Sequence, residues 1–258
     1  MIDKSNQKLL KIAKNIALKA GQVVKEQENL SQKFSFDDEN IKEMKAEMDI
    51  VIEKIIIEEL MLTGLSILSE EKGCISGDRL DSRRWIIDPI DGTFNFVKKL
   101  GPCAISIGLW DKDLPVFGVV FSLNTNELFW GGKEFGSFCN EDRISVSSAS
   151  NISFSSVCTG FPVRLNMIAN DTAAEFWRSV SSFSKVRMIG CASMSLVYVA
   201  RGSAEAYFEN QIMIWDVAAG IPLVEGAGGR VSIKSGSSLN ALHVFAANKS
   251  IFTAARFE

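Results

Sequence analysis

The chain has 258 residues, of which 47% are hydrophobic and 23% are charged, and its formal net charge at pH 7 is −3. That length allows one large domain or two closely packed ones, with enough chain to bury a sizeable core. Lysine and arginine form no basic tract, so the charge pattern of a nucleic-acid binder is missing and we expect no nucleic-acid partner. The sequence has no apolar run of about 18 residues and no signal-peptide pattern, so we expect no membrane partner.

Cysteine usage points to a reducing compartment. The chain has five cysteines, which are widely spaced and form no C-x-x-C pair. An odd number at such spacing disfavours both a disulfide framework and a zinc site. We therefore expect a cytoplasmic protein.

The N-terminal part is expected to hold two helices and two short strands that end in acids. Apolar residues recur at helical spacing over 6–28, and a second helix is predicted over 50–62 with Asp49 as its cap. The apolar runs 66–69 and 85–88 are predicted to be buried strands. Each of these strands would deliver a carboxylate at its C-terminal end.

The middle of the chain is predicted to form an antiparallel meander. Strands are expected over 104–110, 116–123 and 128–131, joined by short turns. The segment 144–147 is expected to extend this set of strands.

A Ser/Asn-rich stretch at 145–156 predicts a boundary between two packed halves, 1–148 and 149–258. The first half would carry most of the acids discussed below, and the second half would complete the site. In the second half we predict strands over 154–159, 186–189 and 204–209, helices over 171–183, 193–200 and 216–227, and two short strands near Val231 and Val244.

The segment WIIDPIDGTFNF carries the sharpest indication of chemistry. An apolar run ends in Asp88, and Asp91 follows three residues later. Two carboxylates so placed can converge on one hard cation, and the carbonyl oxygen of Ile90 between them could add a third ligand. A helix that begins at Gly92 and Thr93 would present free N–H groups that suit a phosphate.

Each acidic residue could instead have a purely structural role, in a turn or as a helix cap. Asp-Pro and Asp-Gly are common turn dipeptides, so Asp88 and Asp91 could form a turn and a helix cap. The pair Glu70–Glu71 could be a solvated turn, and Asp216, like Asp49, could cap a helix.

Three motifs in order connect these acids. The motifs are Glu-Glu at 70–71, D-P-I-D-G-T-x-N-F from Asp88 and W-D-x-A-A-G from Trp215, with A-G-G downstream. With these motifs, the chain resembles the inositol monophosphatase family over almost its whole length. The resemblance implies an α/β (α+β) fold, the five-layer αβαβα sandwich of the inositol monophosphatase and sugar phosphatase type. It also implies a homodimer and lithium-sensitive, Mg²⁺-dependent hydrolysis of a small phosphorylated polyol or sugar.

The resemblance further implies a centre of two or three cations, Mg²⁺ or alternatively Mn²⁺. Glu70, Asp88 and the carbonyl of Ile90 match the ligands of the first metal, and Asp88, Asp91 and Asp216 match those of the second. Glu70 is also assigned to catalysis, and Asp91 and Asp216 are also assigned to substrate binding. Two divalent ions would offset the repulsion between an anionic substrate and the attacking oxygen.

Other matched positions concern substrate and water. Gly92 and Thr93 match the phosphate-binding turn, and Thr93 also matches the residue that orients the attacking water. Glu209 matches an acid that contacts substrate hydroxyls. The segment expected to line the alcohol pocket consists of Gly190, Cys191 and Ala192. His243 lies in no motif and is expected to be structural, so the mechanism predicted is metal-activated water rather than histidine catalysis.

Asp49 matches the family in two different ways. The family carries Asp-x-x-T followed by a second Asp, whereas the segment around Asp49 has neither Thr nor Pro. If Asp49 matches the first Asp, it is a catalytic partner of Thr93 and supports a third metal. If it matches the second, that partner is missing and only Glu47 lies close by in sequence. Ser69 also replaces the usual Gly before the Glu-Glu pair.

Three hypotheses for function follow. The leading one is a phosphoric monoester hydrolase of the inositol-phosphate type, with inositol-1-phosphate as the default substrate, and it rests on Asn95–Phe96 and Glu209. The alternative is a 3′(2′),5′-bisphosphate nucleotidase or another sugar-phosphate phosphatase, although nucleotidases of this kind carry Lys-Glu where this chain has Phe94–Asn95. The non-enzyme alternative is a catalytically silent scaffold of the same fold.

Overall fold

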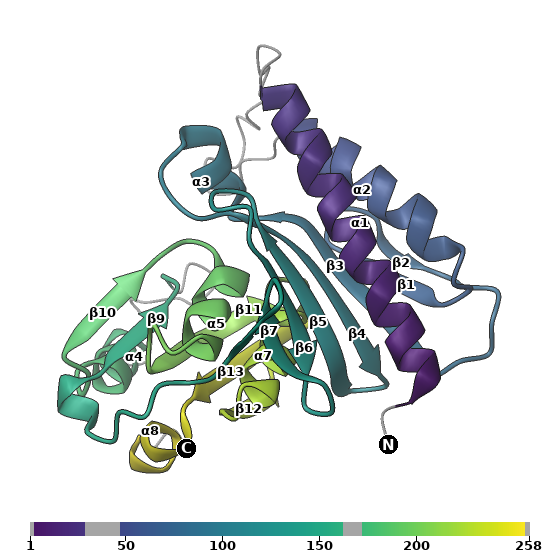
Figure 1. Cartoon of the computed structure of the whole chain (residues 1–258). Coiled ribbons are helices and arrows are strands. Elements are labelled where there is room, and N and C mark those ends of the chain that lie inside the picture. The colour runs from purple at the N-terminus through teal and green to yellow at the C-terminus, as the bar shows by residue number, and fades with distance from the viewer. Residues whose placement is uncertain (1–2, 29–46, 162–171, 256–258) are drawn as a thin grey trace.

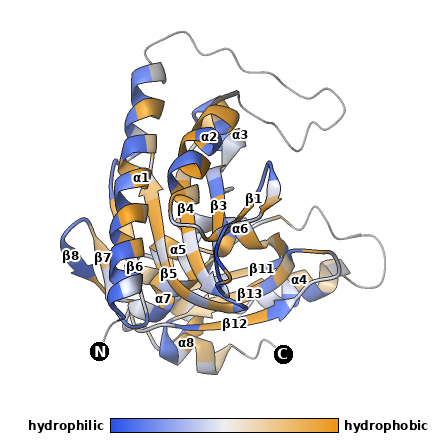
Figure 2. Cartoon of the chain, turned by 90° about the vertical axis from the view of Figure 1, so that its right-hand side faces the viewer, coloured by the Kyte–Doolittle hydropathy of each residue, from blue (hydrophilic) through white to orange (hydrophobic). Residues whose placement is uncertain are grey.

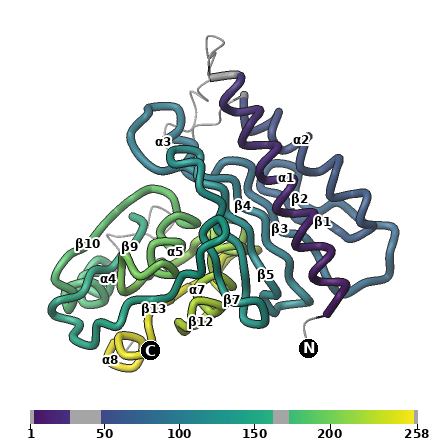
Figure 3. Tube along the Cα trace, viewed as in Figure 1, coloured from purple at the N-terminus to yellow at the C-terminus, as the bar shows by residue number. Residues whose placement is uncertain are grey.

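The computed structural model describes residues 3–28, 47–161 and 172–255, and the structural statements below concern these parts of the chain. They form two β-sheets, one of eight strands and one of five, with helices packed against them (Figure 1). Figure 3 follows the chain from the purple helices through the larger teal sheet into the green and yellow smaller sheet. None of the helices in these ranges is long and apolar enough to cross a membrane.

The first part of the chain supplies the larger sheet and three helices. The helices are α1 Lys4–Glu28, α2 Glu47–Met61 and α3 Thr93–Lys98. The strands are β1 Ser66–Ser69, β2 Gly73–Ile75, β3 Arg83–Asp91, β4 Ala104–Asp111, β5 Leu114–Ser122, β6 Leu128–Gly132, β7 Gly136–Cys139 and β8 Asp142–Ile144.

The second part supplies the smaller sheet and the remaining helices. The strands are β9 Ser156–Thr159, β10 Lys185–Met188, β11 Ala206–Met213, β12 Arg230–Ser235 and β13 Ala241–Ala247. The helices are the 3-10 helix η1 Ile152–Phe154, then α4 Thr172–Val180, α5 Ala192–Ala200, α6 Ile214–Val217, α7 Gly220–Gly226 and α8 Lys249–Ala254.

Strand pairing in the larger sheet follows the chain after one parallel contact. The order is β2-β1-β3-β4-β5-β6-β7-β8, and only β1 and β3 pair in parallel among these neighbours in the described chain. The antiparallel meander predicted for the middle of the chain is therefore confirmed, but the extension predicted over 144–147 is wrong, because the last strand is β8, Asp142–Ile144. In the smaller sheet the order is β10-β9-β11-β13-β12, with β9 parallel to both of its neighbours.

Three hydrophobic cores join the sheets and helices into five layers. The first core packs α1 and α2 on one face of the larger sheet, through residues such as Ile16, Ile56 and Ile87. The second fills the space between the two sheets with α5, α6 and α7, and the third packs α4 and α8 on the outer face of the smaller sheet. Successive β3 residues serve opposite faces, as strand geometry requires: Ile86 faces the second core and Ile87 the first. Figure 2 shows mostly hydrophobic residues along β4 and β5. The predicted five-layer αβαβα sandwich is confirmed.

The helix predicted over 216–227 is wrong in one respect, because it is broken into α6 and α7. In a continuous helix the carbonyl of Ala218 would accept a hydrogen bond from residue 222, but Pro222 has no N–H. The indole Nε1 of Trp110 donates to Ala218 O instead, at 3.0 Å. The break thus replaces a helical hydrogen bond with one from the larger sheet.

Two smaller predictions also need correction. The strand predicted from 154 begins at Ser156, because Asn151 accepts a hydrogen bond from Ser153 N at 2.9 Å and caps the short helix η1. Asp49 does not cap α2, which begins at Glu47. The predicted start of a helix at Asp171 lies outside the described residues.

Gly118→Ala tests the close packing of β5 against the junction between α6 and α7. A Cβ atom on Gly118 would lie 1.9 Å from Ala219 O, so the junction would have to move. We expect the free energy of unfolding, measured by urea denaturation, to fall by about 1–3 kcal/mol. The control is Gly101→Ala, where the nearest atom to the new Cβ lies 3.7 Å away in Asn95. Equal stability of the two variants would contradict this packing.

Candidate metal centre

Strand register brings the first two acids of the centre together. In the parallel pair β1–β3, Ser69 lies opposite Ile87, so Glu70 and Asp88 follow at the same end of adjacent strands. The backbone N–H of Glu70 donates to Ile87 O at 3.3 Å and continues the ladder by one residue. The prediction that a strand delivers an acid at its C-terminal end is confirmed for β1, whereas β3 continues past Asp88 to Asp91, with a shift in its register with β4 between the two acids.

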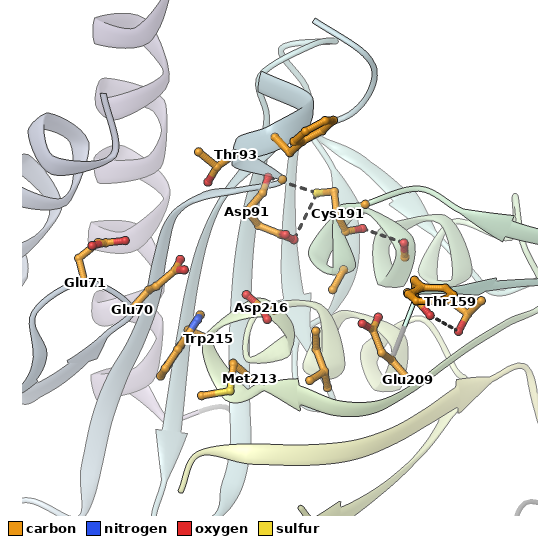
Figure 4. A pocket seen from close by; sticks show the side chains of 18 of the residues that line it. Glu70, Glu71, Asp91, Thr93, Thr159, Cys191, Glu209, Met213, Trp215 and Asp216 are labelled. Atoms are coloured by element: carbon orange, nitrogen blue, oxygen red, sulfur yellow. Dashed lines mark hydrogen bonds between the residues drawn. The ribbon is translucent and has the colours of Figure 1, made fainter. Parts of the chain in front are cut away.

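The third acid comes from the far side of the larger sheet. Asp216 lies on α6, and Ser106 of β4 donates from Oγ to Trp215 O at 3.4 Å. Carboxylate oxygens of Glu70, Asp88 and Asp216 all lie within 4.8 Å of one another. Figure 4 shows Glu70 and Asp216 pointing into the same pocket.

The electrostatics of Asp88 fit a cation. Its side chain is 1% exposed, and its Oδ1 atom has no hydrogen-bond partner among the described residues. Burial, together with the charges of Glu70, Asp91 and Asp216, raises the pKa of this carboxyl well above its usual range. An unpaired buried carboxylate oxygen is costly, and oxygen atoms are the ligands that hard divalent cations prefer. The three acids therefore suit such an ion.

Asp91 lies beside this group but is held by α5. Its Oδ2 atom accepts a hydrogen bond from Ser193 N at 2.6 Å. It also accepts one from Cys191 Sγ at 3.2 Å (Figure 4). Burial raises the pKa of Asp91, and the hydrogen bonds from Ser193 act in the opposite direction. Asp91 lines the pocket, but it is not one of the three acids whose oxygens lie within 4.8 Å of one another. Its predicted role as a metal ligand stays a prediction.

Thr93 connects Asp49 to the end of β3. The Oγ1 atom of Thr93 lies 3.3 Å from Asp49 Oδ2 and 2.9 Å from Ile90 O, and it can donate its hydrogen to either. Asp49 is 4% exposed, although it sits in the first turn of α2. If Asp49 matches the first Asp of the family motif, Thr93 is the neighbour that this match requires. The side chain of Glu47, the other acid considered in the sequence analysis, is not among the side chains that the structure describes.

The turn after Asp91 approaches the loop before α5 closely. Gly92 has a φ of 85°, and a Cβ there would lie 3.1 Å from Gly190 O. The amide Nδ2 of Asn95 donates to Pro102 O at 2.9 Å and to Ile189 O at 2.7 Å. Asn95 is 8% exposed, so its position in the motif is explained by a tether between α3 and this loop.

The predicted pocket residues gather around one cavity of about 590 Å³. Gly190, Cys191, Ala192 and Glu209 all line it, together with Glu70, Asp91, Gly92, Thr93 and Asp216. Glu209 accepts a hydrogen bond from the buried hydroxyl of Tyr207 at 2.8 Å.

Several lining residues were missed by sequence reasoning. They are Glu71, Phe94, Thr159, Gly160, Phe161, Ser195, Ile212, Met213, Trp215 and Ser238. The segment from Thr159 could have been found, because it follows β9, whose parallel neighbours β10 and β11 also run toward the cavity. Ligands commonly bind beyond the carboxyl ends of parallel strands.

His243 lies away from this cavity, on the smaller sheet. Its Nδ1 atom is 2.7 Å from Asn210 Oδ1, and its Nε2 atom is 3.2 Å from Gln211 Nε2. Burial lowers the pKa of this imidazole, with a further contribution from Lys234. These contacts agree with the structural role expected for His243.

Comparison with known proteins gives a consistent result. The sequence profile described as the inositol monophosphatase family matches residues 5–256. The chain is 34% identical over 256 residues to the Nus factor SuhB of Pseudomonas aeruginosa, with 96% of this chain and 94% of that protein covered. It is 32% identical to inositol monophosphatase 2 of Homo sapiens, with 88% of this chain and 81% of that protein covered.

Solved structures agree with the sequence comparison. The inositol monophosphatase from Anabaena has a TM-score of 0.80 to this chain at 31% identity, covering 96% of this chain and 94% of that one. The chain therefore belongs to the inositol monophosphatase family.

Proposed function

We propose that the protein hydrolyses a phosphate monoester of a small polyol or sugar with Mg²⁺, with inositol-1-phosphate as the default substrate. The observation that carries this proposal is the convergence of Glu70, Asp88 and Asp216, with Asp88 Oδ1 buried and unpaired within the described chain. Divalent cations, when bound there, supply charge neutralisation of the phosphate and activation of a water molecule. The relatives carry names of three kinds, Nus factor SuhB, inositol monophosphatase and fructose-1,6-bisphosphatase/inositol-1-monophosphatase, so the substrate is argued from this chain's own pocket.

Individual side chains have separate roles in this proposal. Glu70, Asp88 and Asp216 hold the cations, with the carbonyl of Ile90 and Asp91 as the further ligands proposed. The turn at Gly92 and Thr93 receives the phosphate. Thr93 orients the attacking water, and Asp49 accepts the Thr93 hydrogen and fixes its hydroxyl, which supports the proposal that Asp49 is part of the catalytic set.

The charge of the pocket favours a neutral alcohol as the leaving group. Among its described lining residues, five are acids and none is lysine, arginine or histidine. A second phosphate on the substrate would face carboxylates there and be repelled. Hydroxyl groups, by contrast, can donate to these carboxylates. This charge distribution supports a monophosphate over the bisphosphate of the nucleotidase alternative, whereas other sugar monophosphates remain compatible.

Further features stay predictions. These are a third cation, Mn²⁺ as the ion used, lithium sensitivity, the homodimer and the cytoplasmic location. The silent scaffold remains the non-enzyme alternative, and activity measurements distinguish it from the enzyme.

Glu70→Gln tests the reaction itself. We expect phosphate release from inositol-1-phosphate to fall by about 100-fold or more, because a cation in such a site stabilises the transition state by several kcal/mol. The measurement is a phosphate-release assay in Mg²⁺. Glu134→Gln, on an exposed turn between β6 and β7, is the control and should keep wild-type activity. Equal rates for wild type and Glu70→Gln would contradict the proposal.

A substrate panel tests the preference for one phosphate. We expect kcat/KM for inositol-1-phosphate and sugar monophosphates to exceed that for adenosine 3′,5′-bisphosphate by about 10-fold or more, since one like-charge contact costs about 1.4 kcal/mol or more in a partly buried site. A clear preference for the bisphosphate would reverse the ranking. No turnover of any member in Mg²⁺ or Mn²⁺ would favour the scaffold.

Asp88→Asn tests the electrostatic cost of the centre. Because the pKa of Asp88 is raised on folding, chiefly by burial and by Glu70, the folded state holds this proton more tightly than the unfolded state. The metal-free protein should therefore lose stability as the pH rises above about 4, the ordinary pKa of an aspartate. At neutral pH in EDTA we expect a higher Tm for Asp88→Asn than for wild type, and a smaller gain in Tm from Mg²⁺.

The control for this experiment is Asp113→Asn, on the exposed turn between β4 and β5. It should change neither the Tm in EDTA nor the gain from Mg²⁺. A wild-type Tm in EDTA that stays constant as the pH rises would show that Asp88 is not under electrostatic strain.

A further inference from the structure

A buried carboxylate on α2 takes no part in the site described above. Glu53 is 1% exposed and lies four residues after Asp49, so both acids are on the same face of the helix. Its Oε1 atom accepts hydrogen bonds from Ser69 Oγ at 2.5 Å and from Lys72 N at 3.0 Å. Lys72 Nζ lies 3.9 Å from the other oxygen, Oε2.

These contacts close the turn between β1 and β2. Ser69 ends β1 and pairs with Gly73, which begins β2, and Lys72 is the residue before Gly73. The two residues inside the turn, Glu70 and Glu71, both line the pocket. A single carboxylate oxygen from α2 therefore holds both ends of the turn that carries Glu70.

The turn lies at the edge of the larger sheet. Strand β2 has three residues and is the outermost strand of that sheet. Short edge strands open more readily than central ones, because one side has no neighbouring strand. Strand pairing holds this edge from one side only. The buried contact from Glu53 of α2 restrains it further.

We propose that Glu53 is a positioning residue, which fixes the β1–β2 turn so that Glu70 reaches the cations. The inference rests on the proposed function, since it presumes that Glu70 is a metal ligand. Helix α2 then supports both strand ends of the centre: Asp49 contacts Thr93 beyond β3, and Glu53 holds the end of β1. Groups that orient metal ligands typically change metal affinity by about 10–100-fold when they are replaced.

The competing interpretation is that Glu53 stabilises the turn without influence on the cations. Both roles predict less stable variants, because Glu53→Gln weakens charge-assisted hydrogen bonds and Ser69→Ala takes a donor away from the buried Glu53 carboxylate. Only the positioning role predicts weaker metal binding in a variant that is still folded. Metal affinity, rather than stability, therefore separates the two.

The experiment is calorimetric titration of the full chain with Mg²⁺ and with Mn²⁺, in the absence of substrate. Glu53→Gln keeps the shape and one acceptor oxygen but removes the charge, and Ser69→Ala removes the donor hydroxyl and leaves Glu53 in place. We expect Kd to rise about 10-fold or more in both variants. In assays, kcat at saturating Mg²⁺ should lie closer to the wild-type value than the rate at limiting Mg²⁺.

Glu58→Gln is the matched control. It makes the same change on the same helix, but the Glu58 side chain is 65% exposed and lies 3.9 Å from Lys54. Its Kd for both ions should equal that of wild type. If Glu53→Gln fails to fold, Ser69→Ala decides, because it removes a single hydroxyl group.

Three negative outcomes are distinguishable. Wild-type affinity in the folded variants, with a lower Tm in EDTA, would overturn the positioning role and leave the proposed function intact. A wild-type chain that binds neither ion would overturn both. A wild-type chain that binds the ions but hydrolyses no phosphate monoester would overturn the proposed function alone, while the variant affinities still decide the role of Glu53.

Discussion

Repulsion between carboxylates that the fold forces together is the constraint on which this molecule depends. The parallel register of β1 and β3 sets Glu70 beside Asp88, and α6 adds Asp216. Burial removes the water that would otherwise screen Asp88. The two hydrophobic cores on either face of the larger sheet must hold this arrangement against its own charge. A divalent cation reverses the balance, so that an unfavourable cluster becomes a binding site.

Helices position the acids from both faces of the larger sheet. On one face, α2 contacts the end of β1 through Glu53, and through Asp49 it contacts Thr93, the first residue of α3 after β3. On the other face, the first turn of α5 holds Asp91 through Ser193 N, and α6 is anchored by Trp110 and Ala218. Helices α5 and α6 also pack against the smaller sheet. The geometry of the centre is thus tied to the packing of both sheets rather than to one loop.

Local sequence patterns predicted most elements because their causes are local. Helical periodicity over 6–28 and the turn residues of the meander depend on neighbours in the chain, and both predictions are confirmed. The broken helix after Asp216 was missed although Pro222 was visible, because the alanine-rich segment favours a helix until the missing N–H is counted. The partner that replaces that hydrogen bond, Trp110, is more than 100 residues away and could not be read from the segment.

The sequence by itself determined the family resemblance, the acids that could bind cations and the strand ends that carry them, because motif order and periodicity depend on residues close along the chain. Tertiary structure alone decided which neighbour Asp49 meets, since the sequence allowed two matches and packing of α2 places Asp49 beside Thr93. It also decided that Asn95 tethers the loop at Ile189 and that Glu53 lies beneath the turn of Glu70. These contacts join segments distant in the chain, and their geometry follows from strand register and core packing rather than from any local pattern.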